Sequence, residues 1–294
     1  MKISKHSLLT KLIKKRSRKQ INSYTLIPAS ASALGILIIF YLSLIKRIFM
    51  CFHLSLTKSF KDIEEQSKMV FNDSVSFESY FHFNGWETKN LAIVKQDDPE
   101  LIENATWGLL PTEYNVTKRK EFLIKTNTLN ATKERLFESN LYSQFIKWQR
   151  CLIPADGLFE PHSAIGIQKK IPYYFKEKNH ALIAFAGVYS VINDSTDKPV
   201  YSASIITTEA NSMFKEIHNT PNKLGSYRMP LILDPSNYKN WLQTSEENTF
   251  KELLHTFTNQ ALVNYPISSD LFSNKKDSNM PRILNEVPYQ QGLF

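Results

Sequence analysis

The chain has 294 residues, enough for one large domain or two small ones, and carries a formal net charge of +8. This charge does not indicate a general nucleic-acid surface, because residues 1–50 hold ten basic and no acidic side chains, whereas residues 51–294 carry 26 basic and 28 acidic ones. Any nucleic-acid site in the larger part must therefore be a local patch. Two cysteines exclude a disulfide framework and favour a reducing compartment; Cys151, in an apolar run, is expected to be a buried, unreactive thiol.

The first fifty residues differ from the rest in charge and hydrophobicity. Residues 11–19 form a basic cluster, and residues 26–45 are a nearly uncharged run long enough to span a bilayer as a helix. A membrane anchor here would export the larger part of the chain, because the excess of basic residues precedes the run. The alternative is that translation starts at Met50. We predict an N-terminal extension over residues 1–49 and one domain over residues 50–294, with a mature chain that begins at Cys51.

The dipeptide Met50-Cys51 stands at this boundary and suggests a chemistry. An N-terminal cysteine carries an α-amine that titrates near pH ~8 and a thiol that titrates near ~8.5, so both groups are partly nucleophilic at neutral pH. Together they can capture an aldehyde twice, first as an imine and then as a five-membered thiazolidine ring. Taken alone, the dipeptide is better explained as a chance pair in a strand, so the rest of the chain has to decide.

Beyond Cys51 the hydrophobic pattern predicts short helices and strands. The expected helices cover residues 57–70, 136–148, 237–244 and 246–257. The expected strands cover residues 91–94, 107–111, 150–159, 172–176, 181–192 and 201–207. The dipeptides Asp156-Gly157 and Asn193-Asp194 predict turns between antiparallel neighbours, and the tail is expected to be irregular. The fold class is α+β, a single domain with a mainly antiparallel, strongly curved or barrel-like sheet and flanking helices.

Several motifs of the larger part, taken in order, resemble those of one family. The motifs are Met50-Cys51; Trp107-Gly108-Leu109-Leu110-Pro111; Asn130-Ala131-Thr132-Lys133-Glu134; the run Arg150-Cys151-Leu152-Ile153-Pro154-Ala155-Asp156-Gly157-Leu158-Phe159-Glu160; and Thr207-Thr208-Glu209-Ala210-Asn211 followed by Ile217-His218 and by Arg228-Met229-Pro230-Leu231-Ile232-Leu233. They resemble the SRAP family, the SOS response-associated peptidases that shield abasic sites in single-stranded DNA. The resemblance covers about residues 50–285. Each motif is weak alone, but their order and spacing make the set specific.

The resemblance implies a catalytic set of four residues. The N-terminal cysteine, here Cys51, crosslinks to the ring-opened abasic sugar through a thiazolidine. Asn130 matches the asparagine that orients the cysteine, and Glu160 the glutamate that shuttles protons and, in some members, helps to release Met. His218 matches the histidine that assists sugar opening and contacts the adjoining phosphate. Without the resemblance, Asn130 would be read as a turn residue, Glu160 as a charge at a strand edge and His218 as a cap at a helix end.

The resemblance also implies residues that contact DNA, and here the chain departs from the family. Arg228 matches a phosphate-binding arginine, Tyr114 is the candidate for base stacking, and His53 stands where an arginine is usual near the cysteine. Trp107 is expected in the core rather than on a stacking surface. Thr132 replaces a phosphate-contacting arginine, which should weaken DNA affinity. Other departures are Pro161, where tryptophan is frequent, and an apparent insertion at residues 219–227.

We therefore predict an abasic site processing protein that forms a covalent adduct with single-stranded DNA and exposes Cys51 by its own peptidase activity. It is expected to act as a monomer in the cytoplasm, associated with the nucleoid during DNA damage, and at a membrane only if residues 26–45 are expressed. Eight scattered glycines and the lack of paired His or Cys spacing predict no cofactor and no metal. Two alternatives stay open: a cysteine hydrolase with an N-terminal nucleophile, and a membrane-anchored, non-catalytic binding domain.

Overall fold

The structure is a computed structural model that describes residues 52–288, except residues 74, 223 and 256–260. The predicted extension 1–49, its apolar run 26–45 and Cys51 lie outside the described residues. Within the described ranges, no helix is both long and apolar enough to cross a membrane.

The described residues form strands and short helices. The strands are β1 (His53–Leu56), β2 (Val70–Phe71), β3 (Tyr80–Asn84), β4 (Asn90–Lys95), β5 (Leu101–Trp107), β6 (Asn130–Thr132), β7 (Arg150–Ala155), β8 (Gly157–His162), β9 (Ile171–Glu177), β10 (Ile183–Asn193), β11 (Pro199–Glu209), β12 (Arg228–Pro230), β13 (Ile232–Leu233) and β14 (Leu262–Pro266). The α-helices are α3 (Phe60–Ser67), α4 (Arg119–Lys125), α5 (Arg135–Glu138), α6 (Ser212–Ile217), α7 (Tyr238–Gln243) and α8 (Glu247–Leu253). The 3-10 helices are η2 (Val116–Lys118), η3 (Tyr142–Gln144), η4 (Pro235–Asn237), η5 (Ser269–Phe272) and η6 (Pro281–Leu284).

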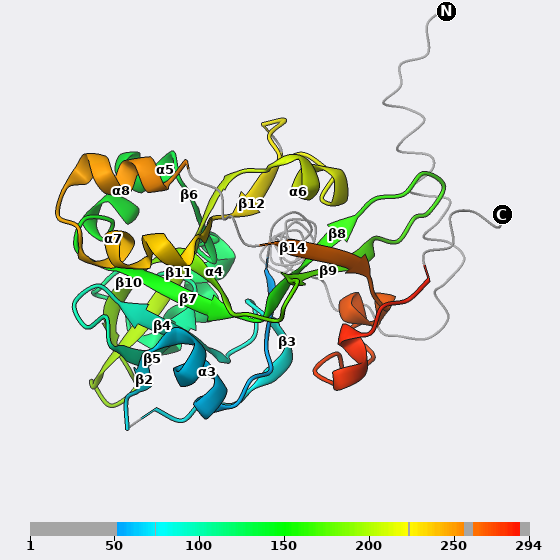
Figure 1. Cartoon of the computed structure of the whole chain (residues 1–294). Helices are drawn as coiled ribbons and strands as arrows, with labels where there is room; N and C mark the ends of the chain where they lie inside the picture. Colours follow the sequence, from blue (N-terminus) through cyan, green and yellow to red (C-terminus); the bar gives the residue numbers. More distant parts are fainter. Residues whose placement is uncertain (1–51, 74, 223, 256–260, 289–294) are drawn as a thin grey trace, which may run out of the picture. The chain divides into compact units, whose positions relative to one another are not determined.

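Five strands close into a barrel, which fills the left half of Figure 1. In the order β11, β10, β7, β4 and β5, each strand pairs antiparallel with the next. A parallel pairing of β5 with β11 closes the circle, with Ala105 opposite Tyr201 and Trp107 opposite Ala203. Closure leaves these five strands without a free edge. The predicted α+β class with a barrel-like, mainly antiparallel sheet is confirmed.

A second, antiparallel sheet has the strand order β14, β9, β8, β1 and β3. The chain passes from the barrel into this sheet at Asp156, so β7 and β8 belong to different sheets. The prediction that Asp156-Gly157 turns between antiparallel neighbours is therefore wrong. Glycine is required at position 157 because a Cβ there would collide with the carbonyl of Phe175 and the ring of Tyr174. The turn predicted at Asn193-Asp194 is confirmed, since β10 and β11 pair directly.

Two hydrophobic cores lie on opposite sides of the second sheet. The main core fills the barrel and includes Trp107, whose indole N–H donates to the carbonyl of Leu129 at 2.9 Å. Trp107 is thus a core residue, as predicted. Cys151 is also buried in the main core, as predicted, and burial raises the pKa of its thiol. The smaller core consists of Phe159, Tyr174, Ile267, Leu271 and Ile283.

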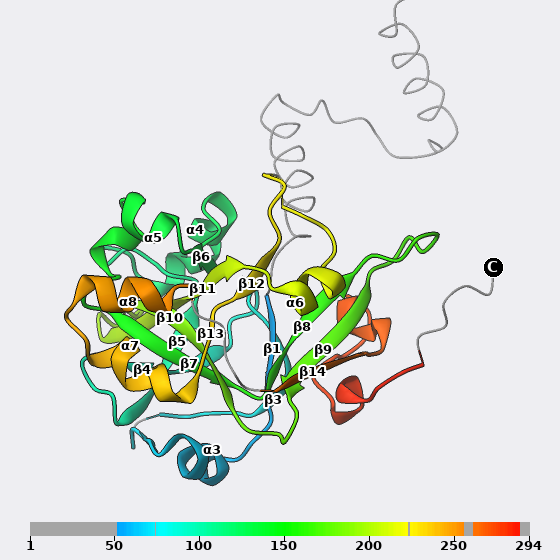
Figure 2. The ribbon, with the colours of Figure 1, turned by 45° about the horizontal axis from the view of Figure 1, so that its top comes forward.

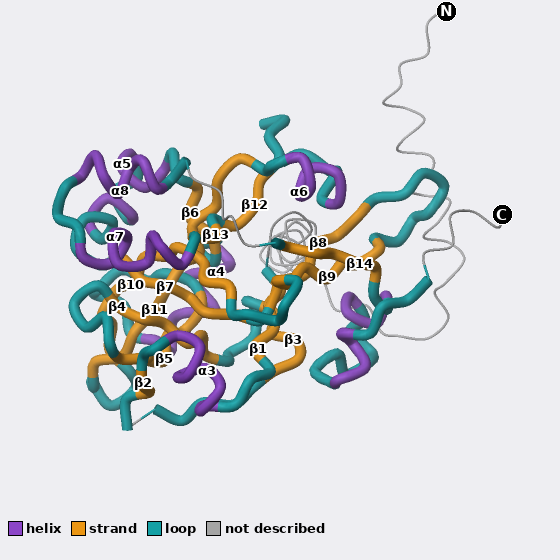
Figure 3. The backbone as a smooth tube through the Cα atoms, in the orientation of Figure 1, coloured by secondary structure: helices purple, strands orange, loops and turns teal. Residues whose placement is uncertain are grey.

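Most α-helices lie around the barrel in Figure 3, whereas α6 lies beside β8 and β12. The 3-10 helices η5 and η6 contact the second sheet. Helices α5 and α8 contact each other through the stacked rings of Phe137 and Phe250. The prediction of one helix over residues 136–148 is wrong, because α5 ends at Glu138 and a separate 3-10 turn, η3, follows. Ser139 adopts an extended conformation, and its hydroxyl accepts from the N–H of Leu141 in competition with the helix. The tail also contains β14, which the sequence pattern did not indicate.

Candidate active site

Strand β8 places Glu160 on the face of the second sheet that looks toward the main core. Side chains alternate along a strand, so Leu158 and Glu160 share one face while Phe159 points to the other. Accordingly, Leu158 belongs to the main core and Phe159 to the smaller one. Glu160 is fully buried, at 0% exposure. It is therefore not the solvated strand-edge charge that its position in the sequence would also allow.

Helix α6 brings His218 to Glu160. The side chain of Asn211 caps the start of the helix by accepting from the N–H of Phe214, and the helix ends with His218 at its C-cap. Nδ1 of His218 lies 2.6 Å from Oε2 of Glu160, and both side chains are almost completely buried. Burial opposes a charge on the imidazole, but the adjacent carboxylate outweighs it and raises the pKa of His218 above its ordinary value. Such a pair can accept and donate a proton in turn.

The second oxygen of Glu160 has a different environment. Oε1 is buried, and no described residue donates a hydrogen bond to it. A buried carboxylate oxygen is stable only when a donor satisfies it. The pair thus presents an acceptor suited to a protonated amine or a hydroxyl.

Strand β6 places Asn130 beside the barrel. β6 runs parallel to β11 with Asn130 opposite Ile205, and Asn130 is buried. Its backbone carbonyl accepts from the hydroxyl of Tyr142 at 3.3 Å. Asn130 therefore occupies a fixed strand position rather than the alternative turn position.

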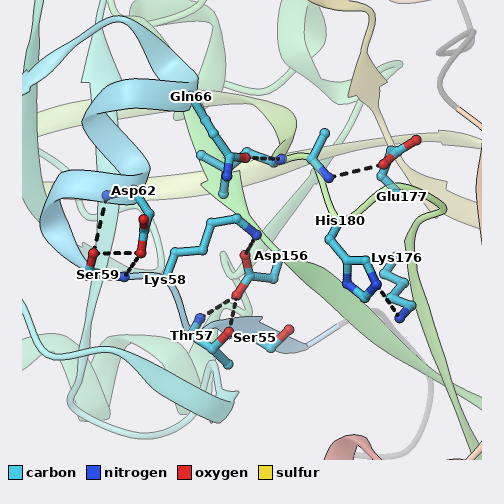
Figure 4. Close-up of polar contacts among 12 residues, drawn as sticks. Ser55, Thr57, Lys58, Ser59, Asp62, Gln66, Asp156, Lys176, Glu177 and His180 are labelled. Carbon is cyan, nitrogen blue, oxygen red and sulfur yellow. Dashed lines mark hydrogen bonds and ion pairs between the residues drawn. The ribbon is translucent and has the colours of Figure 1, made fainter.

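The chain enters the second sheet along β1, which lies between β3 and β8. Asp156 anchors the far end of this strand, as Figure 4 shows. Its carboxylate accepts from the backbone N–H of Thr57, from the hydroxyl of Thr57 at 2.6 Å and from the ammonium of Lys58 at 2.7 Å. Sequence reasoning had placed Asp156 only in a turn, because nothing in the pattern pairs residues a hundred positions apart.

The structure turns the ring of His53 toward the C-terminal segment. His53 Nδ1 lies 2.8 Å from Nε2 of His82, and the two rings stack with centroids 5.0 Å apart. Nδ1 of His82 in turn contacts the hydroxyl of Ser278 at 2.7 Å. Burial lowers the pKa of His53 to about 4 and, with the charge of His53, that of His82 to about 2. At neutral pH both rings are therefore uncharged, which does not favour a phosphate contact by His53.

Tyr114 and Arg228 lie on other elements. Tyr114 follows the Pro111 turn, and its half-buried ring packs edge-on against Phe122 at 4.9 Å. Arg228 begins β12, where one guanidinium nitrogen lies 2.9 Å from Glu134 and another donates to the carbonyl of Thr207 at 2.5 Å. The structure thus brings Glu160 and His218 into direct contact, whereas Arg228 has an internal carboxylate partner.

A pocket of about 360 Å³ lies elsewhere, between α3 and the start of β10. Its lining includes Gln66, Met69, Leu152, Ile183 and Tyr238. None of the predicted site residues lines it, and its lining is largely apolar. It offers no acid–base group comparable to the pair on β8 and α6.

A closed barrel with an attached sheet makes the described part of the chain an α+β domain, and a buried carboxylate–imidazole pair lies on β8 and at the end of α6. The chain belongs to the SRAP family: the family model described as SOS response associated peptidase (SRAP) matches residues 50–274. The resemblance inferred from the motifs is therefore confirmed.

Relatives of known name agree with this assignment. Abasic site processing protein YoqW of Bacillus subtilis (strain 168) is 30% identical over 234 residues, which are 78% of this chain and 97% of YoqW. Abasic site processing protein HMCES of Rattus norvegicus is 25% identical over 60% of this chain and 54% of its own length. A crystal structure of a protein from Bacteroides thetaiotaomicron has a TM-score of 0.68 at 27% identity and covers 81% of this chain and all of its own.

Proposed function

We propose that this protein captures abasic sites in single-stranded DNA by forming a covalent bond to Cys51, in a form whose chain begins at that residue. Membership of the SRAP family supports the proposal, as do relatives named abasic site processing proteins. The observation that carries it is the buried 2.6 Å contact between Glu160 and His218 on the face of β8 toward the main core.

The register of β1 relates this pair to the N-terminal cysteine. Leu54 pairs with Leu158 and Ser55 with Gly157, so the same register carried back two positions sets Phe52 opposite Glu160. Consecutive Cα atoms are ~3.8 Å apart. We therefore propose that an amine on residue 51 comes within reach of the Glu160 carboxylate.

The proposed reaction forms two bonds at one carbon. The amine of Cys51 adds to the aldehyde carbon of the ring-opened sugar, and loss of water gives an imine. The thiol then adds to the imine carbon and its proton passes to the nitrogen, which closes the thiazolidine. Glu160 accepts the proton that the attacking amine releases, and protonated His218 donates a proton to the departing oxygen. Asn130 orients the cysteine.

The same carboxylate serves the peptidase step in this proposal. Glu160 activates a water molecule that hydrolyses the bond between Met50 and Cys51, which frees the amine. The protein acts as a monomer on DNA in the cytoplasm, at the nucleoid during damage. Tyr114 stacks on a base, and Arg228 contacts a phosphate when its pairing with Glu134 opens.

The decisive experiment compares three proteins that lack residues 1–50 on a denaturing gel with a labelled abasic oligonucleotide. The parent should form a heat-stable adduct with abasic single strands and none with intact DNA. Cys51→Ser should lose this adduct but still be trapped by borohydride, since its amine can form the imine. One alanine added before Cys51 should abolish the stable ring, because amine and thiol then belong to different residues.

The outcome also separates the alternative functions. An alanine-extended protein that crosslinks like the parent would refute the thiazolidine mechanism. Repeated turnover of an amide substrate without a stoichiometric adduct would instead support the cysteine hydrolase.

A further inference from the structure

Two loops meet around His218. One connects β8 to β9 over residues 163–170, and the other follows α6 over residues 219–227, which the family resemblance predicts to be an insertion. Figure 2 shows α6 lying between β12 and β8. One loop follows β8, the strand that carries Glu160, and the other follows His218 at the end of α6. The contacts between these loops determine how firmly His218 is held.

Hydrogen bonds between side chains and backbone hold the residues on either side of His218. The ring Nδ1 of His162 contacts the carbonyl of Ile217 at 2.9 Å. The side chain of Asn219 accepts from the N–H of Ser163 at 2.9 Å and donates to the carbonyl of Ser163 at 2.8 Å. His218 is therefore bracketed by two attachments to the end of β8, the strand that carries Glu160.

A lysine completes this arrangement. The hydroxyls of Ser163 and Thr220 lie 2.8 Å apart, and the ammonium of Lys170 donates to Thr220 at 2.8 Å and also to Ser163. Burial lowers the pKa of Lys170 relative to a solvated lysine. The charge is thus fixed between the two loops rather than left in solvent.

We propose that Lys170 is a positioning residue for the Glu160–His218 pair and acts through the hydroxyls of Ser163 and Thr220. The proposal rests on the proposed role of that pair in crosslinking. Two charged groups act on the His218 ring: Glu160 from β8 and Lys170 from the loop that precedes β9. His162 is bonded to Ile217, and Arg228 of β12 is paired with Glu134.

The two charges act in opposite directions on His218. Glu160 favours the imidazolium, whereas the positive charge of Lys170 disfavours it. A histidine held only by a buried carboxylate would keep its proton and be a poor donor. Lys170 therefore lowers the pKa of His218 toward its ordinary value, which makes release of the proton easier.

The first test is an NMR titration of His218 in the full chain, which needs no DNA. Lys170→Met should raise the pKa of His218 by about half a unit, because a nearby like charge is removed. Lys169→Met is the matched control, since it removes the same charge from an exposed neighbour in the same loop and should leave the titration unchanged. Thr220→Val keeps the charge of Lys170 but removes one of its hydrogen-bond acceptors. It should therefore raise the pKa of His218 by less than Lys170→Met does.

The second test is the pH profile of crosslinking in the same variants. In Lys170→Met the alkaline limb of the pH–rate profile should shift to higher pH, and in Lys170→Arg it should lie at the same pH as in the parent. A purely structural loss would instead lower the rate at every pH. The proposal is overturned if Lys170→Met and Thr220→Val leave the His218 titration in place, or if Lys169→Met shifts it equally. If the parent forms no adduct at all, the proposed function fails, but the titration still decides the role of Lys170.

Discussion

At the residue scale, Glu160 and His218 depend on each other for their charge. Either group alone would be a costly charge at this depth, because burial penalises an isolated ion. Side by side at 2.6 Å they stabilise each other, and the pKa of His218 is raised as a result. Changing one member should therefore alter both the chemistry and the pH dependence of stability.

Glu160→Gln should slow crosslinking about 100-fold, because one acid–base group is removed. The measurement is the rate of adduct formation on an abasic single strand, with intact mass reporting Met50 removal. Glu216→Gln, at an exposed position of α6 two residues before His218, is the control and should react like the parent. An unchanged rate with complete Met50 removal would show that Glu160 is only structural.

Glu160→Gln should also change the free energy of unfolding, by an amount that depends on pH. Because the folded pKa of His218 lies above its unfolded value, its contribution is fully present below the unfolded pKa and is lost as pH rises through the folded pKa. Glu160→Gln removes the cause of the raised pKa, so it should destabilise the protein by about 2 kcal/mol at acidic pH. Urea unfolding at pH 5.5 and pH 8.5 should show a smaller difference at the higher pH.

The His53–His82 contact predicts the opposite pH dependence. The folded pKa of His53, about 4, lies below its unfolded value, so its contribution is present above the unfolded pKa and is lost as pH falls toward 4. Glutamine at position 53 cannot titrate. His53→Gln should therefore reduce the stability lost between the unfolded pKa of histidine and pH 4 by about 1–3 kcal/mol. His180→Asn, at an exposed left-handed position, is the control and should leave the acid dependence of unfolding as it was.

Motif matching located Glu160 and His218, but it could not show what surrounds them. Asp156, Ser163, Lys170 and Thr220 are polar loop residues of a kind found throughout the chain, and their partners lie far away in the sequence. Arg150 is similar: it opens a predicted strand, yet it is fully buried and donates to backbone carbonyls, among them those of Trp241 and Thr244. Such roles depend on tertiary distances that local patterns do not contain.

At the element scale, β1 is a four-residue strand held on both sides and at its far end. It pairs with β3 and β8, and Asp156 binds the backbone and side chain of Thr57 and the side chain of Lys58. Because β1 begins two residues after Cys51, its position sets the geometry of the proposed crosslink.

Asp156→Ala should destabilise the protein by about 3 kcal/mol, because it removes charge-assisted hydrogen bonds and leaves the N–H of Thr57 without its acceptor. The free energy of unfolding in urea measures this effect. Lys61→Met, which breaks an exposed pair with Glu65, should change it by less than about 0.5 kcal/mol. Equal effects of the two substitutions would contradict an anchoring role for Asp156.

Sequence patterns predicted strands better than the ends of helices. The run from β7 to β11 was expected because it alternates β-branched and aromatic residues with turn signals. The division between α5 and η3 was missed because the helical spacing of Phe137, Leu141, Phe145 and Trp148 continues across Ser139, where the helix stops. Side-chain competition for one N–H overrode the periodic pattern there.

At the scale of the whole molecule, the distribution of charge limits DNA affinity. Residues 51–294 have a net charge of −2, and basic residues near β6 and β12 already have acidic partners: Lys133 pairs with Glu209 and Arg228 with Glu134. Few phosphates can therefore be neutralised when DNA binds.

Binding to undamaged single strands should be weak and only moderately salt-sensitive. Roughly three neutralised phosphates would give a log–log salt slope near −2 for single strands. Fluorescence anisotropy between 50 and 300 mM salt measures the slope for the protein without residues 1–50. A slope several times steeper would reveal a basic groove that the paired side chains do not provide.

The barrel could be predicted only as a class. Antiparallel neighbours followed from the pattern, but it predicted six strands where the described residues form fourteen. The parallel pairing of β5 with β11 joins segments almost a hundred residues apart. Its register is set by closure and by packing around Trp107, which no local signal specifies.

The placement of β1 between two neighbours has a mechanical consequence. If DNA is attached at residue 51, a motor protein that pulls the DNA along the axis of β1 applies a shear force to the hydrogen bonds with β3 and β8. Under shear these bonds must break together rather than one after another. The anchor at Asp156 resists the same force at the far end of the strand. An adduct at residue 51 would therefore stay attached under tension until the second sheet itself unfolds.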